Sequence, residues 1–262
     1  MYVFYKYFKF DINIKINEYI NCNTMPVIVS VEGNIGSGKS TFIRQLQTYT
    51  NTHTQPQAYS ITFIQEPVDE WEKIRDSSGE SILEKFYKDQ SEYGFSFQIM
   101  AYITRLRKLV DAIESNPDGI FICERSLETD KYVFAKMLYD NQKIKEIDWN
   151  IYNYWFQTFV DKVQTNKIMY IQTSPINCYN RVKQRNRSGE NNIPLVYLEN
   201  CHNYHETWLG QSTVNITTID GNVDIHDQEI YTHVLQSTLQ EIIADYDKTY
   251  KTYNTIPEER TR

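Results

Sequence analysis

Eight residues near the start of this chain constrain its fold more than any other segment. From Gly33 to Ser40 they match the complete Gly-x-x-x-x-Gly-Lys-Ser/Thr pattern of a phosphate-binding loop. In such a loop the glycines let backbone N–H groups turn toward phosphate oxygens, and the helix that follows presents its positive N-terminal end to the same anion. The pattern therefore predicts a strand, a phosphate-binding turn and a helix in that order.

The surrounding sequence supplies that context and repeats it. Runs of β character cover residues 27–32, 61–66, 120–124, 168–173 and 215–220, with helical segments between them, including 41–48 directly after the loop. The first four runs are largely apolar, as expected for strands buried on both faces of a parallel sheet, whereas the more polar fifth suits an edge. We expect an α/β protein of the P-loop NTPase type, a three-layer fold with a five-stranded parallel sheet flanked by helices.

Length and charge restrict the number of domains and the class of partner. The 262 residues suit one α/β domain, and the net charge of −7 disfavours nucleic-acid binding, which needs many Lys and Arg side chains. No apolar stretch approaches the roughly 18 residues of a membrane span. We therefore expect no nucleic-acid partner, no membrane partner and a cytoplasmic location.

The first 24 residues differ from the rest of the chain. They lack the continuous apolar core of a signal peptide, and they lack the Arg residues of a transit peptide. Met25 and Pro26 stand directly before the first predicted strand. We expect residues 1–24 to be a poorly ordered extension or to precede the native start, and residues 25–262 to form a single domain.

The loop predicts a site for a nucleoside triphosphate, ATP or another, together with Mg²⁺. Lys39 is expected to reach the β and γ phosphates, and the Ser40 hydroxyl to hold the metal ion. The other residues predicted to bind the donor phosphates are Gly33, Asn34, Gly36, Ser37, Gly38 and Thr41.

Two acidic residues stand at the carboxyl ends of predicted strands, where ligands bind in open α/β sheets. Glu66, fixed by the proline after it, is a candidate base for a hydroxyl acceptor. Glu124 is a candidate to bind Mg²⁺ directly or through water, and Arg125 is a candidate to orient Glu66 or bind phosphate. One such carboxylate alone would be interpreted as a solvated strand end, but two beside a phosphate loop favour function.

Three arginines, Arg181, Arg185 and Arg187, lie within seven residues. The first two are four apart and share a helix face, and the predicted loop 186–192 follows. The alternatives are a solvated basic patch or a nucleic-acid contact. In an acidic protein with a phosphate loop, we favour an arginine-rich lid that stabilises the charge of the transferring phosphoryl group, with Arg185 as its catalytic member.

The segment 96–115 has helical periodicity. Ile99, Ile103, Leu106 and Val110 form one apolar face, and Gln98, Ala101 and Arg105 form the neighbouring one. A glutamine donates and accepts at once, which suits adenine N6/N7 or cytosine N3/N4. Arg105 is interpreted either as a surface residue of a basic run or as the bidentate partner of Asp130, which lies four residues before Phe134 on the next helix.

Seven motifs together resemble the deoxyribonucleoside kinases, over residues 26–224. They are Gly33–Ser40, Glu66-Pro67-Val68-x-x-Trp71, Phe95-Ser96-Phe97-Gln98, Glu124-Arg125-Ser126 with Asp130-x-Tyr132-x-Phe134, Arg181-x-x-x-Arg185-x-Arg187, Ile193-Pro194-Leu195-x-Tyr197-Leu198 and His205-Glu206-x-Trp208-Leu209. The resemblance implies transfer of a phosphoryl group from ATP or another triphosphate, with Mg²⁺, to the 5′-hydroxyl of a deoxynucleoside in nucleotide salvage.

The resemblance also implies residue roles. Glu66 would be the base, Arg125 its support and Glu124 the residue that serves the metal. Tyr87 and Glu190 match positions that contact the sugar 3′-hydroxyl, and Trp71 and Phe134 match walls of the base pocket. Family members with Arg and Asp at the positions of Arg105 and Asp130 resemble deoxycytidine and deoxypurine kinases, so we expect deoxycytidine, deoxyadenosine or deoxyguanosine to be preferred over thymidine. The family is usually homodimeric.

Two other functions compete with this one. A thymidylate-kinase-like nucleoside monophosphate kinase shares the fold, but its usual Asp-Arg pair is replaced here by Glu124 and Arg125, and Glu66 suits a neutral hydroxyl better than a phosphate acceptor. A non-catalytic nucleotide-binding or DNA-associated ATPase module would not need the complete catalytic set.

Overall fold

The computed structural model describes residues 26–53, 59–160, 163–187, 189–190, 193–223 and 228–254. Five strands form one sheet. They are β1 (Val27–Glu32), β2 (Ile61–Ile64), β3 (Ile120–Glu124), β4 (Lys167–Gln172) and β5 (Asn215–Asp220). Every pairing is parallel and the strand order is β2-β3-β1-β4-β5, so β1 lies at the centre. This confirms the predicted five-stranded parallel sheet.

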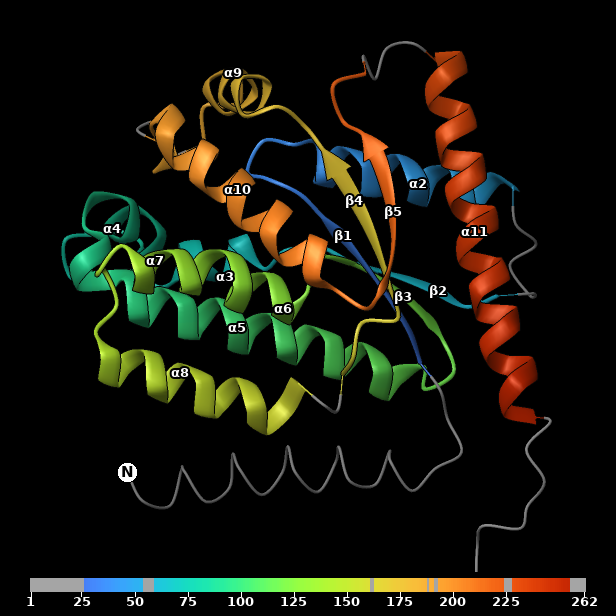
Figure 1. Cartoon of the computed structure of the whole chain (residues 1–262), viewed down its shortest axis with the longest axis horizontal. Helices are drawn as coiled ribbons and strands as arrows, with labels where there is room; N and C mark the ends of the chain where they lie inside the picture. The colour runs from blue at the N-terminus through green and yellow to red at the C-terminus, as the bar shows by residue number, and fades with distance from the viewer. Residues whose placement is uncertain are drawn as a thin grey trace, which may run out of the picture.

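Helices connect the strands and cover both faces of the sheet (Figure 1). In chain order they are α2 (Lys39–His53), α3 (Val68–Lys73), α4 (Ile82–Lys88), α5 (Gln90–Ser115), α6 (Leu127–Thr129), the π-helix η1 (Asp130–Ala135), α7 (Lys136–Asp140), α8 (Glu146–Phe159), α9 (Pro175–Arg185), α10 (Leu195–Gln211) and α11 (Gln228–Asn254). None of the helices in the described part of the chain has the length and apolar character needed to span a bilayer.

Alternating side chains of the central strands build two separate cores. Val27, Val29 and Val31 of β1 pack with apolar residues of α2 and α11. Ile28 of β1 and Phe121 of β3 point to the opposite face and pack with α5 and α8. Figure 1 shows α11 on one side of the sheet and α5 on the other. The three-layer arrangement follows from the period-two alternation of a strand buried on both faces.

Several boundaries differ from those predicted. Helix α2 runs from Lys39 to His53, beyond the predicted helical segment 41–48 at both ends. Helix α5 begins at Gln90 instead of Ser96, because the Asp89 side chain caps it by accepting from the backbone N–H groups of Ser91 and Glu92. The extension 1–24 and the suggested start at Met25 lie outside the described residues.

The prediction that β2 is buried on both faces was wrong. It is an edge strand with partly exposed residues, and it ends at Ile64, two residues before Glu66. Apolar composition alone does not distinguish an edge strand from a central one. The polar fifth strand, β5, occupies the opposite edge, as predicted.

An ion-pair cluster holds the C-terminal helix against the sheet. Lys167, the first residue of β4, has only 1% of its side chain exposed, and its Nζ lies 2.6 Å from Glu241 Oε1 and 2.9 Å from Asp245 Oδ2 of α11. The two carboxylates are more than one third exposed. The buried ammonium group therefore needs the carboxylates to compensate its charge, whereas water can solvate the carboxylates without it.

This asymmetry predicts unequal effects of substitution. The double variant Glu241→Gln/Asp245→Asn leaves a buried charge without a counter-charge, so we expect the free energy of unfolding to fall by about 3 kcal/mol. Lys167→Met leaves two carboxylates that water can reach, and should cost less than about 1 kcal/mol. Urea denaturation measures both, and a larger loss for Lys167→Met would contradict the asymmetry.

Candidate active site

A cavity of about 870 Å³ opens where β1, β2 and β3 end. Most of the residues predicted from the sequence line it, namely Gly36, Gly38, Lys39, Ser40, Thr41, Glu66, Trp71, Tyr87, Gln98, Ala101, Arg105, Glu124, Arg125, Asp130, Phe134, Arg181, Arg185, Arg187 and Glu190. The structure therefore brings side chains from distant parts of the sequence to one place, as the strand ends predicted.

The remaining three predicted residues, Gly33, Asn34 and Ser37, form the buried inner side of the phosphate loop. The Asn34 side chain faces the protein, because its Nδ2 donates to Leu198 O at 2.7 Å. Gly33 has a φ of +143°, and a Cβ there would lie 2.6 Å from Ile171 O. The loop can follow this path against β4 only with glycine at this position.

Lys39 at the start of α2 binds the loop itself. Its Nζ donates to Gly33 O at 3.1 Å and Asn34 O at 2.8 Å. Burial, with the positive charge of Arg125 as a second cause, lowers the pKa of Lys39 to about 8. The ammonium group lies at the N-terminal end of α2, where an anion is favoured.

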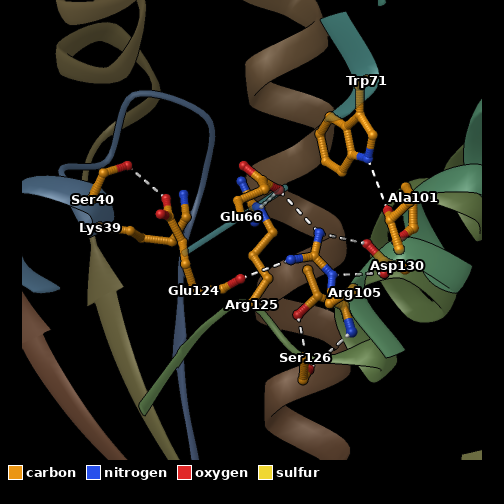
Figure 2. Close-up of polar contacts among 12 residues, drawn as sticks. Lys39, Ser40, Glu66, Trp71, Ala101, Arg105, Glu124, Arg125, Ser126 and Asp130 are labelled. Atoms are coloured by element: carbon orange, nitrogen blue, oxygen red, sulfur yellow. Dashed lines mark hydrogen bonds and ion pairs between the residues drawn. The ribbon is translucent and has the colours of Figure 1, made fainter. Parts of the chain in front are cut away.

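Ser40 and Glu124 form the pair predicted to serve the metal. The Ser40 hydroxyl donates to Glu124 Oε1 at 2.6 Å, and both residues line the cavity (Figure 2). A hydroxyl and a carboxylate are hard oxygen donors, which Mg²⁺ binds through one or two protein groups and several waters. The donor set therefore fits Mg²⁺.

Glu66 receives two guanidinium groups on the same oxygen. Its Oε1 lies 3.0 Å from Arg105 Nη2 and 3.3 Å from Arg125 Nε. Burial would raise the pKa of Glu66, but the charges of Arg125 and Arg105, helped by Lys39, outweigh it and lower the pKa to about 2. The carboxylate is therefore ionised at neutral pH and ready to accept a hydrogen bond.

Arg105 is the centre of this polar network (Figure 2). Its Nε and Nη2 donate to the two oxygens of Asp130 at 2.9 and 3.2 Å, and its Nη1 donates to Glu124 O at 2.7 Å. Only 6% of its side chain is exposed. The bidentate pair with Asp130 is therefore confirmed, and the interpretation of Arg105 as a surface residue was wrong.

Arg125 is held in an unusual backbone conformation. Its φ of +69° lies in the left-handed region, which costs an L-residue with a side chain roughly 1–2 kcal/mol. The conformation aims the side chain back toward the loop, where Nη1 donates to Gly33 O at 2.8 Å. The guanidinium carbon lies 4.8 Å from the centre of the Phe134 ring. Such strain at a site usually marks a functional constraint.

Aromatic rings form the walls of the deep part of the cavity. Trp71 and Phe97 pack edge to face with centroids 5.3 Å apart, and Phe86 stacks on Phe97 at 4.4 Å. Gln98 is buried and its Oε1 has no partner among the described residues. An unpaired buried amide costs free energy, so this group is suited to bind a ligand atom.

Glu190 binds two of the three arginines in the segment 181–187, Arg185 and Arg187. It accepts from Arg185 Nη2, and from Arg187 Nη1 at 3.2 Å. Its negative charge, after the larger effect of burial, raises the pKa of Tyr87 well above the ordinary value. Tyr87 and Glu190, which were predicted to share the sugar contact, therefore lie near each other.

Arg181 has a different set of partners. Its guanidinium group donates to Ser37 O at 3.1 Å and to Gly221 O at 2.8 Å. It therefore joins the phosphate loop to the turn after β5. The three arginines lie around the cavity but do not act as one uniform set.

Sequence reasoning missed several residues of the site. Leu83 and Phe86 line the cavity, and the Thr104 hydroxyl accepts from Trp71 Nε1 at 2.9 Å. The position of Thr104, three residues after Ala101, was a signal for the same helix face. Glu32 was assigned only to its strand, although an acidic residue in an apolar run next to a phosphate loop is itself unusual.

Comparison with known proteins agrees with this geometry. A family profile described as deoxynucleoside kinase matches residues 29–256. The chain belongs to the deoxynucleoside kinase family. It is 34% identical to a probable deoxycytidine kinase of fowlpox virus, over 87% of this chain and 94% of the viral one. It is 32% identical to human deoxycytidine kinase over 76% of this chain and 85% of that enzyme. It is also 32% identical to a mitochondrial deoxyguanosine kinase of Xenopus laevis, over 72% of this chain and 75% of that one.

Membership settles the reaction class. This deoxynucleoside kinase transfers a phosphoryl group from a nucleoside triphosphate to a deoxynucleoside. The resemblance inferred from the seven motifs is confirmed. The thymidylate-kinase-like and non-catalytic alternatives are not needed to explain the site.

The contacts of Arg185 generate a prediction for turnover. Arg185→Ala removes a positive charge at the cavity, so we expect kcat to fall about 1,000-fold or more, the lower end of the range for other phosphoryl-transfer arginines. Lys183→Ala on the same helix is the control, because Lys183 does not line the cavity. Steady-state kinetics and thermal unfolding measure the two effects. Unchanged turnover in Arg185→Ala would exclude the catalytic role.

Proposed function

We propose that this enzyme phosphorylates the 5′-hydroxyl of deoxycytidine or a purine deoxynucleoside in preference to thymidine, with ATP or another triphosphate and Mg²⁺. The observation that carries the base preference is the buried Arg105–Asp130 pair beside Gln98. The Asp130 carboxyl group accepts from Arg105, so it favours the exocyclic amine of adenine or cytosine over thymine, which presents a carbonyl at the equivalent position. The curated names of the similar kinases agree with this preference.

Residue roles follow from charge and position. Because both guanidinium contacts of Glu66 fall on Oε1, we infer that Oε2 accepts the hydrogen bond of the substrate hydroxyl. A carboxylate with a pKa near 2 is a weak base. This suffices for a loose phosphoryl transition state, in which the hydroxyl needs orientation early and gives up its proton late. Lys39 and Arg185 would stabilise the charge on the transferring group.

Mg²⁺ would be held by Ser40 and Glu124, with phosphate oxygens and water completing its shell. It would supply charge neutralisation of the β and γ phosphates. We also propose that Arg181, Arg185 and Arg187 act as a lid over the donor, and that Tyr87 and Glu190 contact the sugar 3′-hydroxyl. The cytoplasmic location and the single domain 25–262 remain predictions of the sequence.

A second copy of this chain is the proposed partner of α8. Ile147, Ile151 and Tyr154 recur at helical spacing and have exposed fractions of 64%, 41% and 63%. Such an apolar face on the outside of a protein marks an interaction surface. The usual homodimer of the family accounts for it.

Sedimentation velocity tests the homodimer. We expect the wild-type chain to sediment as a dimer, and Ile147→Glu/Ile151→Glu to sediment as a monomer because charges are buried at the interface. Ile74→Glu is the control, since Ile74 follows α3, away from α8 in the sequence, and is 50% exposed. A wild-type monomer at micromolar concentration would refute the proposal.

Initial rates on the four deoxynucleosides test the base preference. We expect kcat/KM for thymidine to be at least about tenfold below the best substrate, which corresponds to about 1.4 kcal/mol of discrimination. Asp130→Asn keeps the shape of the side chain but removes its charge, and should reduce the ratio of kcat/KM for the best substrate to kcat/KM for thymidine. Thymidine as the best substrate by tenfold would contradict the proposal, whereas no phosphorylation of any deoxynucleoside would contradict the reaction itself.

A further inference from the structure

Glu32 is a buried carboxylate outside the cavity. It is the last residue of β1, its exposed fraction is 0%, and it is absent from the residues that line the cavity. Three donors reach it. Ser30 Oγ and Ser126 N each donate to Oε1 at 2.8 Å, and Thr129 Oγ1 donates to Oε2. A buried charge is costly unless it is bonded in this way, so an apolar residue would fill this position more simply.

The bonds of Glu32 fall on the segment that carries Arg125. Ser126 is the next residue, and its backbone N–H is fixed by the carboxylate. The N–H of Arg125 itself donates to Val31 O at 3.1 Å. Two consecutive residues of β1 therefore hold two consecutive N–H groups, on either side of a backbone with a φ of +69°.

We propose that Glu32 is a positioning residue that keeps Arg125 in its left-handed conformation, and so keeps its guanidinium group on Glu66 and on the phosphate loop. Thr129, at the end of α6, ties the same carboxylate to the far side of the turn. Glu32 touches neither substrate and acts only through Arg125. The inference rests on the role expected of Arg125, which is to support Glu66, the proposed base.

The geometry explains why the support must come from β1. Arg125 Nη1 donates to Gly33 O, and Gly33 directly follows Glu32. The carboxylate and the carbonyl therefore belong to adjacent residues at the point where the strand becomes the phosphate loop. One short segment fixes both the backbone of Arg125 and one partner of its side chain.

A double-mutant cycle tests the proposal. Glu32→Ala frees the turn, and we expect kcat to fall about 10- to 100-fold, the range for misplacing a catalytic group. In an Arg125→Ala background the same change should cost less than about threefold, because the group it positions is gone. Equal losses in both backgrounds would show that Glu32 supports the fold or the loop in general, and would overturn the proposal.

Conservative variants make the cycle decisive. Glu32→Gln retains an oxygen for Ser126 N–H and an amide that donates to the Thr129 hydroxyl, so kcat should stay within about fivefold of wild type. A loss as large as that of Glu32→Ala would overturn the hydrogen-bond mechanism. Glu32→Asp shortens the side chain by one methylene, and repeats the cycle if Glu32→Ala does not fold.

If Arg125→Ala alone leaves kcat unchanged, the role of Arg125 fails and the inference fails with it. A wild-type chain without kinase activity would contradict the proposed function, and the inference that rests on it would fail as well.

Discussion

The shared contact of two arginines with one oxygen of Glu66 is the interaction on which the site depends. Arg105 comes from α5 and Arg125 from the end of β3, so the carboxylate joins two layers of the fold. Each guanidinium also binds elsewhere, Arg105 to Asp130 and Arg125 to the phosphate loop. Losing Glu66 would therefore leave two buried cations short of a partner, so the residue that we propose as the base also stabilises the structure of the site.

Charge balance extends this point to the whole cavity. Three basic groups, Lys39, Arg105 and Arg125, lie against the three carboxylates of Glu66, Glu124 and Asp130. The formal charges of these six side chains therefore balance. A triphosphate brings several negative charges, and the Mg²⁺ and the arginines at 181–187 that we propose for the donor site would supply the additional positive charge. This explains how a chain with a net charge of −7 can bind an anion.

The sequence predicted the elements better than their arrangement. The phosphate loop and its flanking strand and helix followed from local pattern, because glycines and alternating apolar residues act over a few positions. The order β2-β3-β1-β4-β5 did not follow, since it depends on how distant strands pair. For the same reason the edge position of β2 was not predicted. Its residues are as apolar as those of a central strand, so composition gave no sign of it.

Within the site, the limit of prediction was also set by distance in the chain. Helical spacing placed Gln98, Ala101 and Arg105 on one face, and that face does line the cavity. Helical spacing could not predict the hydrogen bond between Arg105 and Glu66, which are 39 residues apart, or the one between Asn34 and Leu198, which are 164 apart. The left-handed backbone of Arg125 was equally hidden, because an arginine gives no local signal for a positive φ.

The cations of the donor site already have acceptors within the protein. Lys39 binds two carbonyls of the loop, Arg181 binds carbonyls of Ser37 and Gly221, and Arg185 binds Glu190. Phosphate binding therefore exchanges one set of hydrogen bonds for another, and the net gain per bond is smaller than the bond itself. These contacts still favour binding, because the cationic side chains are already ordered and lose little further side-chain entropy when the triphosphate binds.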